Sequence, residues 1–182
     1  MKARTAVLSI LLLCSPAAIA QWREKGKVVP DTPSAKSDGE FGAMFEFTDR
    51  PDELYKAWEK PGPDVQWSRT SKAVRGVPIV GVVFFTGCAP NATGNCELVG
   101  RFILTTPSGK PWGQPIDADI WVDLPPPTGS ALQLSHQHLG LVIDPGDELG
   151  TYSARAELTD RVAKKKMVLE QQFTAVEAPT KK

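Results

Sequence analysis

Apolar residues recur along the chain in short runs, each about the length of a β-strand, with turn-forming residues between them. In residues 41–48 (FGAMFEFT) every second side chain is apolar, which places those side chains on one face of an extended segment. The same alternation marks residues 117–124 (DADIWVDL) and 151–158 (TYSARAEL). Further apolar runs occupy residues 76–87, 97–106, 132–134, 139–143 and 167–176. The pattern predicts an all-β fold, an antiparallel β-sandwich of about seven to nine strands.

One segment, residues 49–62 (DRPDELYKAWEKPG), follows a helical period instead. Asp49 is placed to cap a helix whose first turn contains Pro51, and Leu54 and Trp58 fall one turn apart on one side. In the run 76–87 both the odd-numbered and the even-numbered positions carry apolar side chains, which predicts a strand buried on both faces. One face would meet the opposite sheet, so we expect the helix to cover the other through Leu54 and Trp58.

The two ends of the chain differ from the middle. Residues 1–20 combine two cations, a short apolar run and a closing Ala-Ile-Ala, which is typical of a cleaved signal peptide. Residues 21–40 are polar and interrupted by proline and glycine, which predicts a flexible N-terminal segment. The expected organisation is therefore a leader, this segment, a sandwich domain over 41–178 and a short tail at 179–182.

Composition narrows the setting in which the protein works. The chain carries 21 basic and 21 acidic residues, and no basic stripe is interleaved with aromatic residues, so nucleic acid is not an expected partner. No apolar run after residue 20 is long enough to predict a membrane span. Export predicts a periplasmic or secreted protein, in a compartment where disulfides persist.

Cys88 and Cys96 enclose a loop of turn-forming residues between two apolar runs. A structural zinc site needs four ligands, usually with closely paired cysteines, and a thioredoxin-like site needs a C-x-x-C spacing. The sequence matches neither pattern. We therefore predict a disulfide that joins the two strands across this loop.

Three acids and a tryptophan form the first candidate surface. Strict alternation in residues 117–124 would turn Asp117, Asp119, Trp121 and Asp123 outward. An exposed tryptophan among carboxylates can stack on a sugar or dock a partner protein. The alternative is that a loop or the N-terminal segment covers Trp121 and that the acids are simply solvated.

His136 and His138 form the second candidate site, because an extended backbone would place both imidazoles on one face. Such a pair could bind copper or zinc. No third ligand is evident, and the residues considered for that role are Met44, Met167 and Asp144. The alternative is a polar loop with two solvated histidines. Ser135 lacks an orienting acid, so the segment does not resemble a hydrolase site.

Residues 147–152 (DELGTY), followed by an alternating segment, resemble the corner before strand F of immunoglobulin-like domains. That resemblance implies a structural role for Tyr152, whose hydroxyl would bond to the backbone upstream. Antibody domains carry a cysteine two residues after this tyrosine, whereas this chain has Ala154. The acids Asp144, Asp147 and Glu148 could also bind calcium, although the corner turn accounts for them without an ion.

The segments FTDRPDELYKAW, RGVPIVGVVFFTGC, DADIWVDLPPP and PGDELGTY together are similar to a group of uncharacterised exported proteobacterial proteins with an immunoglobulin-like β-sandwich. The resemblance covers nearly all of the chain after residue 20, and it implies a fold and a compartment but no activity. We therefore expect a non-catalytic module without a cofactor, a protein-interaction or envelope accessory protein. The alternatives are a carbohydrate-binding module through Trp121 and a periplasmic copper or zinc binder through His136 and His138.

Overall fold

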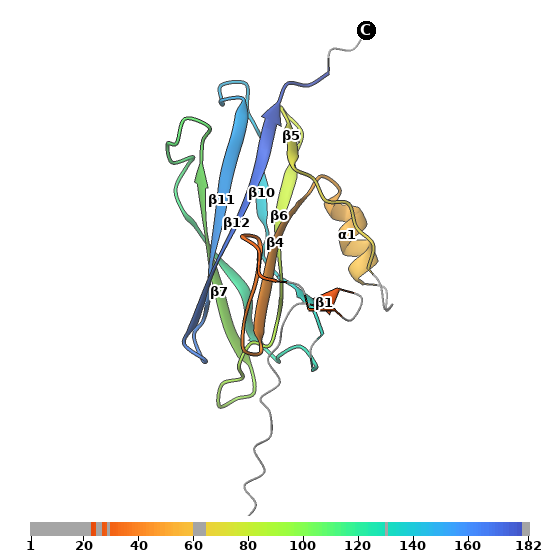
Figure 1. The fold of residues 1–182 in the computed structure, drawn as a ribbon, viewed down its shortest axis with the longest axis vertical. Coiled ribbons are helices and arrows are strands. Elements are labelled where there is room, and N and C mark those ends of the chain that lie inside the picture. Colours follow the sequence, from red (N-terminus) through yellow and green to blue (C-terminus); the bar gives the residue numbers. More distant parts are fainter. Residues whose placement is uncertain (1–22, 25–26, 29, 60–64, 130, 180–182) are drawn as a thin grey trace, which may run out of the picture.

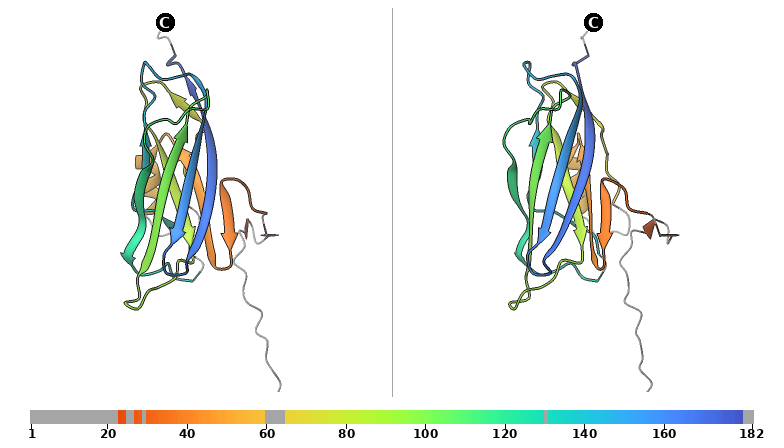
Figure 2. Two further views of the ribbon diagram at one scale, coloured as in Figure 1. Left: turned by 90° about the vertical axis from the view of Figure 1, so that its left-hand side faces the viewer. Right: turned by 60° about the vertical axis from the view of Figure 1, so that its left-hand side comes forward.

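The computed structural model describes residues 23–24, 27–28, 30–59, 65–129 and 131–179. Within them, two five-stranded sheets pack face to face, and a helix, α1 (Pro51–Trp58), lies on the outside of one sheet (Figures 1 and 2). The fold is therefore a two-layer, mainly β structure, as the sequence pattern predicts. The expected leader, residues 1–20, lies outside the described residues.

The first sheet has the order β10-β6-β4-β3, and β9 also pairs with β6. Its strands are β3 (Ala35–Asp38), β4 (Phe41–Thr48), β6 (Ile79–Thr86), β9 (Gln133–Leu134) and β10 (Leu139–Leu141). All of its pairings are antiparallel.

The second sheet has the order β5-β12-β11-β7-β8. Its strands are β5 (Lys72–Val74), β7 (Cys96–Thr105), β8 (Ile116–Leu124), β11 (Gly150–Asp160) and β12 (Lys165–Val176). The pairing of β12 with β5 is parallel, so the expectation of a purely antiparallel sandwich is wrong at this edge. A separate small hairpin joins β1 (Arg23–Glu24) to β2 (Lys27–Val28).

The core lies between the two sheets and is rich in aromatic rings. The Phe45 ring centroid lies 5.2 Å from that of Phe47 and 5.6 Å from that of Phe102 on the opposite sheet. Phe47 in turn meets Phe173 of β12 edge-on at 5.1 Å. Side chains from alternate positions of both sheets thus interdigitate in one apolar layer, which is the packing that the alternating sequence predicts.

Helix α1 covers the outer face of the first sheet, as predicted. Leu54 is fully buried and shares a cluster with Val82 and Phe84 of β6, and the Trp58 ring centroid lies 5.3 Å from that of Phe84. This contact explains why β6 carries apolar side chains on both of its faces. The expected cap is wrong, because Arg50 occupies the N-cap position and its side chain makes no capping hydrogen bond.

The sequence predicts a flexible segment over residues 21–40, but part of this range forms the regular strand β3. This strand pairs in register with β4 after a turn in which Gly39 adopts a φ of +64°. Figure 2 shows β3 beside β12, where the two sheets meet, and the Lys36 ammonium donates to the Val168 carbonyl at 2.7 Å. Polar side chains suit this position because an edge strand is covered on only one side.

The predicted disulfide is present, with Cys88 and Cys96 joined across 5.9 Å between their Cα atoms. The loop is also bonded to the turn between β11 and β12. The fully buried Asp160 accepts at 2.8 Å from the Ala89 amide beside Cys88, and its other oxygen accepts at 2.9 Å from the Val162 amide. The disulfide loop and this turn therefore form one connected end of the sandwich.

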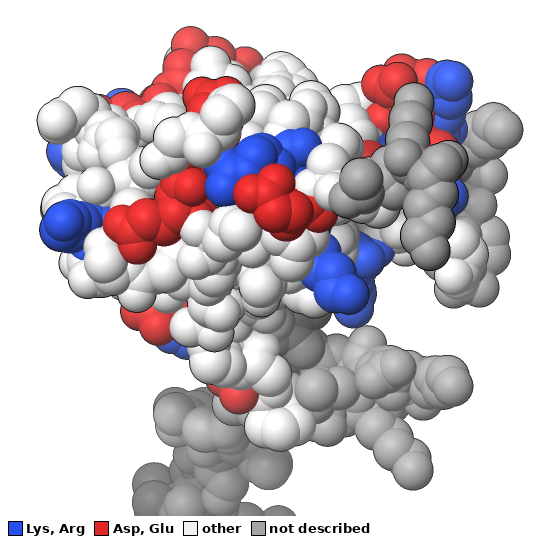
Figure 3. Space-filling view, turned by 90° about the horizontal axis from the view of Figure 1, so that it is seen from above, with Lys and Arg blue, Asp and Glu red and all other residues white. Residues whose placement is uncertain are grey.

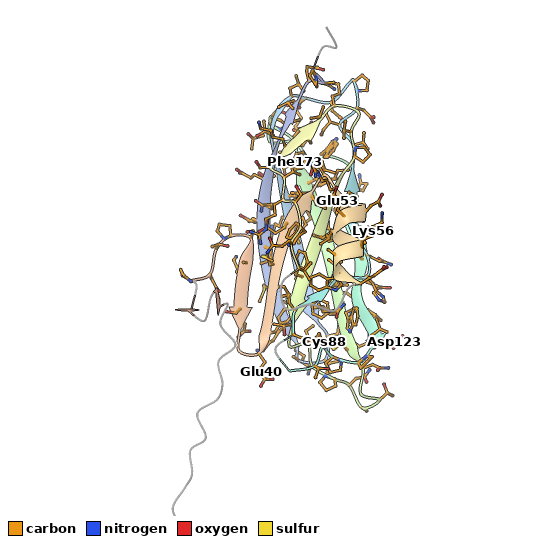
Figure 4. All side chains as sticks on the ribbon, turned by 90° about the vertical axis from the view of Figure 1, so that its right-hand side faces the viewer. Glu40, Glu53, Lys56, Cys88, Asp123 and Phe173 are labelled. Carbon is orange, nitrogen blue, oxygen red and sulfur yellow. A yellow bond between two sulfur atoms is a disulfide. The ribbon has the colours of Figure 1, made fainter. Side chains whose placement is uncertain are left out.

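Gly87 allows the chain to enter this loop. Its φ is +69°, and a Cβ atom built there would lie 1.7 Å from the Glu40 carbonyl oxygen. Figure 4 shows Glu40 and Cys88 at the same end of the molecule. The close approach of two backbone segments therefore requires glycine at this position.

The opposite end of the sandwich is held by Tyr152 and Arg75. The Tyr152 hydroxyl donates to the Glu148 carbonyl at 2.8 Å, and burial raises the pKa of this phenol. The Arg75 guanidinium pairs with Glu177 at 3.0 Å and donates to the Asp147 carbonyl at 3.2 Å. Seen from this end, basic and acidic side chains lie beside one another across the surface (Figure 3).

Candidate binding site

Strand β8 departs from regular alternation at a β-bulge. Val99 of β7 pairs with Asp119 and Leu98 pairs with Trp121, so Ile120 is an extra residue on β8. A second irregularity lies near Asp123, which has a φ of +57°. Each extra residue reverses the faces to which the following side chains point, because the side-chain period of a strand is two.

The bulge turns Trp121 toward the core, so the prediction of an outward, acid-ringed tryptophan is wrong. Its ring centroid lies 5.6 Å from that of Phe85 and 4.7 Å from that of His136. The indole Nε1 donates to the Pro125 carbonyl at 2.8 Å. Asp117 and Asp119 precede the bulge and remain exposed, so the acids and the tryptophan do not form one surface.

The bridging segment, residues 135–138, contains both histidines and joins the two sheets. Four residues separate β9 from β10, whereas only two residues of β6 separate the positions with which these strands pair. The segment is therefore too long to pair regularly with β6. The Ser135 amide donates to the Val83 carbonyl in the first sheet at 2.8 Å, and the His136 amide donates to the Ile120 carbonyl in the second at 3.0 Å. The bridging segment therefore meets the bulge of β8, and together they close one side of the sandwich.

The two histidines contact different aromatic rings. His136 is exposed and lies against Trp121, whereas His138 is half-buried and stacks on Tyr55 of α1 at 5.1 Å. Burial lowers the pKa of His138, and the nearby His136 lowers it further. The Ser135 hydroxyl is buried, lies 3.3 Å from His138 Nδ1 and accepts from the Val83 amide.

The histidine pair belongs to no larger group of His, Cys, Asp or Glu side chains in the part of the chain that the structure describes. No three His, Cys, Asp or Glu side chains among those residues lie close enough together to hold an ion. Met44 packs beside α1, and Met167 lies in the core between the sheets.

The acids at the Tyr152 corner are engaged by protein donors. One oxygen of Asp147 accepts from the Trp112 indole at 3.2 Å and the other from the Asp144 amide at 2.8 Å. Glu148 accepts from the Ser108 amide at 3.0 Å and from its hydroxyl at 2.7 Å. These hydrogen bonds account for the acidic residues as part of the corner turn.

A shallow depression of about 440 Å³ lies on the outer face of the second sheet, beside β8. Its lining residues are Val99, Gly100, Asp117, Ala118, Asp119, Gln137 and Arg161. We call it the edge depression. Two of the predicted surface acids therefore belong to a concave site, whereas Asp123 and Trp121 are not among the residues that line it.

The residues that line the edge depression include two acids and two side chains that can donate hydrogen bonds, and they come from different elements. Asp117 and Asp119 come from β8, Gln137 from the bridging segment and Arg161 from the turn after β11. The Gln137 Oε1 atom accepts from the Asp119 amide at 2.9 Å, which directs the side-chain amide toward β8. The Arg161 amide donates to the Glu97 carbonyl at 3.0 Å, which fixes the backbone of the turn.

The charges that line this depression do not neutralise one another at short range. Asp117 pairs with Arg101 at 3.8 Å, with both side chains more than half exposed. Among the described residues, neither Asp119 nor Arg161 has an ion-pair partner within 4.0 Å. Asp119 and Arg161 thus line one depression, and neither takes part in an ion pair among the described residues.

Sequence reasoning missed Gln137 and Arg161. The two residues come from different elements, and neither belongs to a recognisable motif. Gln137 lies between the histidines that drew attention, but only the bridging hydrogen bonds bring it to Asp119.

The fold and site define a two-sheet β-sandwich with a polar depression at one edge. Neither a family model nor a curated protein sequence matches the chain. A family 123 glycoside hydrolase from Clostridium perfringens resembles it with a TM-score of 0.39 and 10% identity over 76% of this chain, which spans 28% of the hydrolase chain. A Niemann-Pick type C2 protein from the Japanese carpenter ant resembles it with a TM-score of 0.37 and 11% identity, over 59% of this chain and 79% of that one. Both likenesses are too distant to indicate what binds at the site.

Proposed function

We propose that this protein is an exported, non-catalytic binding module of the immunoglobulin-like type, an accessory protein of the cell envelope. Its ligand or partner binds at the edge depression. The observation that carries this proposal is the presence of Asp119 and Arg161 in one concave site, each without an ion-pair partner among the described residues. Charged groups in such a position bind complementary groups at little cost in lost internal contacts.

Two features support the immunoglobulin-like assignment and export. The hydrogen bond from Tyr152 to the Glu148 carbonyl matches the tyrosine corner of that fold class. The Cys88–Cys96 disulfide fits an oxidising compartment, and the sequence of residues 1–20 fits a signal peptide. No helix among the described residues has the length and apolar character needed to cross a bilayer.

Binding fits the geometry better than catalysis does. In the bridging segment, the Ser135 hydroxyl lies near His138, but it is buried and already accepts a hydrogen bond from the Val83 amide. A nucleophile must present its oxygen to a substrate, and Ser135 does not. The edge depression is shallow and water-exposed, whereas electrostatic catalysis depends on a site from which water is excluded.

The test is retention from an envelope extract by the immobilised full-length chain. We expect the wild type to retain material that Asp119→Asn and Arg161→Gln lose. Asp123→Asn and Arg155→Gln are matched controls, because they make the same changes outside the depression on β8 and β11. If all five proteins retain the same material, the edge depression is not the binding site and the proposal fails.

A further inference from the structure

We infer that the edge depression binds a small zwitterion of the amino acid or dipeptide class. Its ammonium group lies against Asp117 and Asp119, and its carboxylate lies against Arg161 and the Gln137 amide nitrogen. This inference rests on the proposed function, since it takes the depression to be the binding site. It goes further by naming the ligand chemistry that this set of side chains complements.

Some of the lining side chains can only accept hydrogen bonds, and others are available only to donate them. The two carboxylates only accept, so they suit an ammonium group with its three donors. Arg161 only donates, and a guanidinium binds a carboxylate through two parallel hydrogen bonds. The Gln137 oxygen is engaged by the Asp119 amide, so its NH₂ group is the part left to act as a donor toward a ligand.

The apolar part of the lining favours a compact ligand over a sugar ring. Its residues are Val99, Gly100 and Ala118, and no aromatic residue is among those that line the depression. Sugar binding usually uses a flat aromatic face, which Trp121 would have provided had it pointed outward. The volume of about 440 Å³ falls in the range of small-molecule sites, about 300–1,000 Å³.

The backbone around the depression is fixed before a ligand arrives. The Asp119 amide is held by Gln137, and the bridging segment is bonded to both sheets. On the other side, the buried Asp160 carboxylate accepts from the Val162 and Ala163 amides of the turn that carries Arg161. A fixed backbone reduces the entropy lost on binding, which helps a shallow site to hold a small ligand.

The experiment is a titration of the full-length chain, followed by amide chemical shifts in NMR and by calorimetry. The probes are alanyl-alanine, its methyl ester, which lacks the carboxylate, and N-acetyl-alanyl-alanine, which lacks the ammonium. We expect the dipeptide to bind with a Kd on the order of 1 mM or tighter, and each blocked probe to bind at least about fivefold more weakly. Shift changes should centre on Val99, Asp119 and Arg161.

Variants identify the group that each residue recognises. Arg161→Gln should abolish the preference for the dipeptide over its methyl ester, and Asp119→Asn should abolish the preference over the acetylated probe. Val99→Trp should block all binding, because Val99 is a half-buried residue of the lining and a larger side chain there would fill the depression without removing a charge. Asp123→Asn should bind as the wild type does.

Three outcomes overturn the inference: no binding of the dipeptide up to tens of millimolar, equal binding of all three probes, or binding that survives Val99→Trp. The proposed function has a separate outcome. If the depression variants lose retention of envelope material while no zwitterion binds, the depression remains the binding site and only the ligand class is wrong.

Discussion

The Cys88–Cys96 disulfide gives the most direct test of how this end of the sandwich is stabilised. The perturbation is its removal, either by reduction or by the double substitution Cys88→Ala/Cys96→Ala. The two cysteines are 8 residues apart, and closing a loop of this size in the unfolded chain is worth about 2.5 kcal/mol by chain entropy. For a domain of this size, that loss corresponds to a fall in Tm of roughly 8 °C.

The native contacts of the loop should survive without the disulfide. Asn91 accepts through its side chain from the Thr93 amide at 2.9 Å and from the Asn95 amide at 3.0 Å, and Asp160 still holds the Ala89 amide. The expected effect is therefore a lower free energy of unfolding with little change in the folded structure. The binding that we propose for the edge depression should persist below the melting transition.

The assay compares urea unfolding and calorimetry of the oxidised protein, the reduced protein and the double alanine variant. Adding reductant to the alanine variant is the control, and it should change nothing. Because both sulfur atoms are buried, the alanine variant should be slightly less stable than the reduced protein. An unchanged Tm after complete reduction would refute the chain-entropy reasoning.

Three further predictions concern other parts of the fold. Gly87→Ala should lower the free energy of unfolding, measured in urea, by at least about 3 kcal/mol, because its Cβ would meet a backbone carbonyl. The control Gly94→Ala, at a position with a φ of +88° and open space around it, should cost only about 1 kcal/mol. Equal losses would contradict the backbone-contact argument. Leu54→Ala should lower the free energy of unfolding by about 2–5 kcal/mol, because it removes the buried contact between α1 and β6. Lys56→Ala, at an exposed position of the same helix, should change it by no more than about 0.5 kcal/mol. Similar values for the two variants would show that the helix is not docked. Because the folded-state pKa of His138 lies below its usual value of 6.5, the unfolded chain binds the proton more readily, so stability should fall as the pH drops through 6.5. His138→Gln should remove that part of the pH dependence, and an NMR titration giving a pKa at or above 6.5 would contradict it.

Most of the strands were predictable because their side chains alternate without interruption. The bounds of β4 follow from Phe45 and Phe47 on one face, and the double-sided pattern of residues 79–86 predicted that α1 would cover β6. Strands β3 and β5 were not predictable, because they are edge strands of only four and three residues, too short to show a clear alternation. Their pairing depends on partners far away in the chain, such as the parallel contact of β5 with β12.

The candidate site was predictable only in part. Asp117 and Asp119 were identified from local alternation, which holds up to the bulge at Ile120. Beyond it the face reverses, so Trp121 was assigned to the wrong side. Arg161 could not be found from the sequence, since the turn after β11 reaches the depression only through the register of β11 with β7.

The sequence by itself determined the mainly β class of the fold, the helix that covers one sheet and the disulfide between Cys88 and Cys96. Each of these follows from periodicity or spacing over a few neighbouring residues, which is information that the local chain contains. Only the tertiary structure decided which charged groups share a concave surface. One extra residue in β8 and the bridging segment between the sheets place Gln137 beside Asp119 and turn Trp121 inward, and neither effect has a local signal in the order of the amino acids.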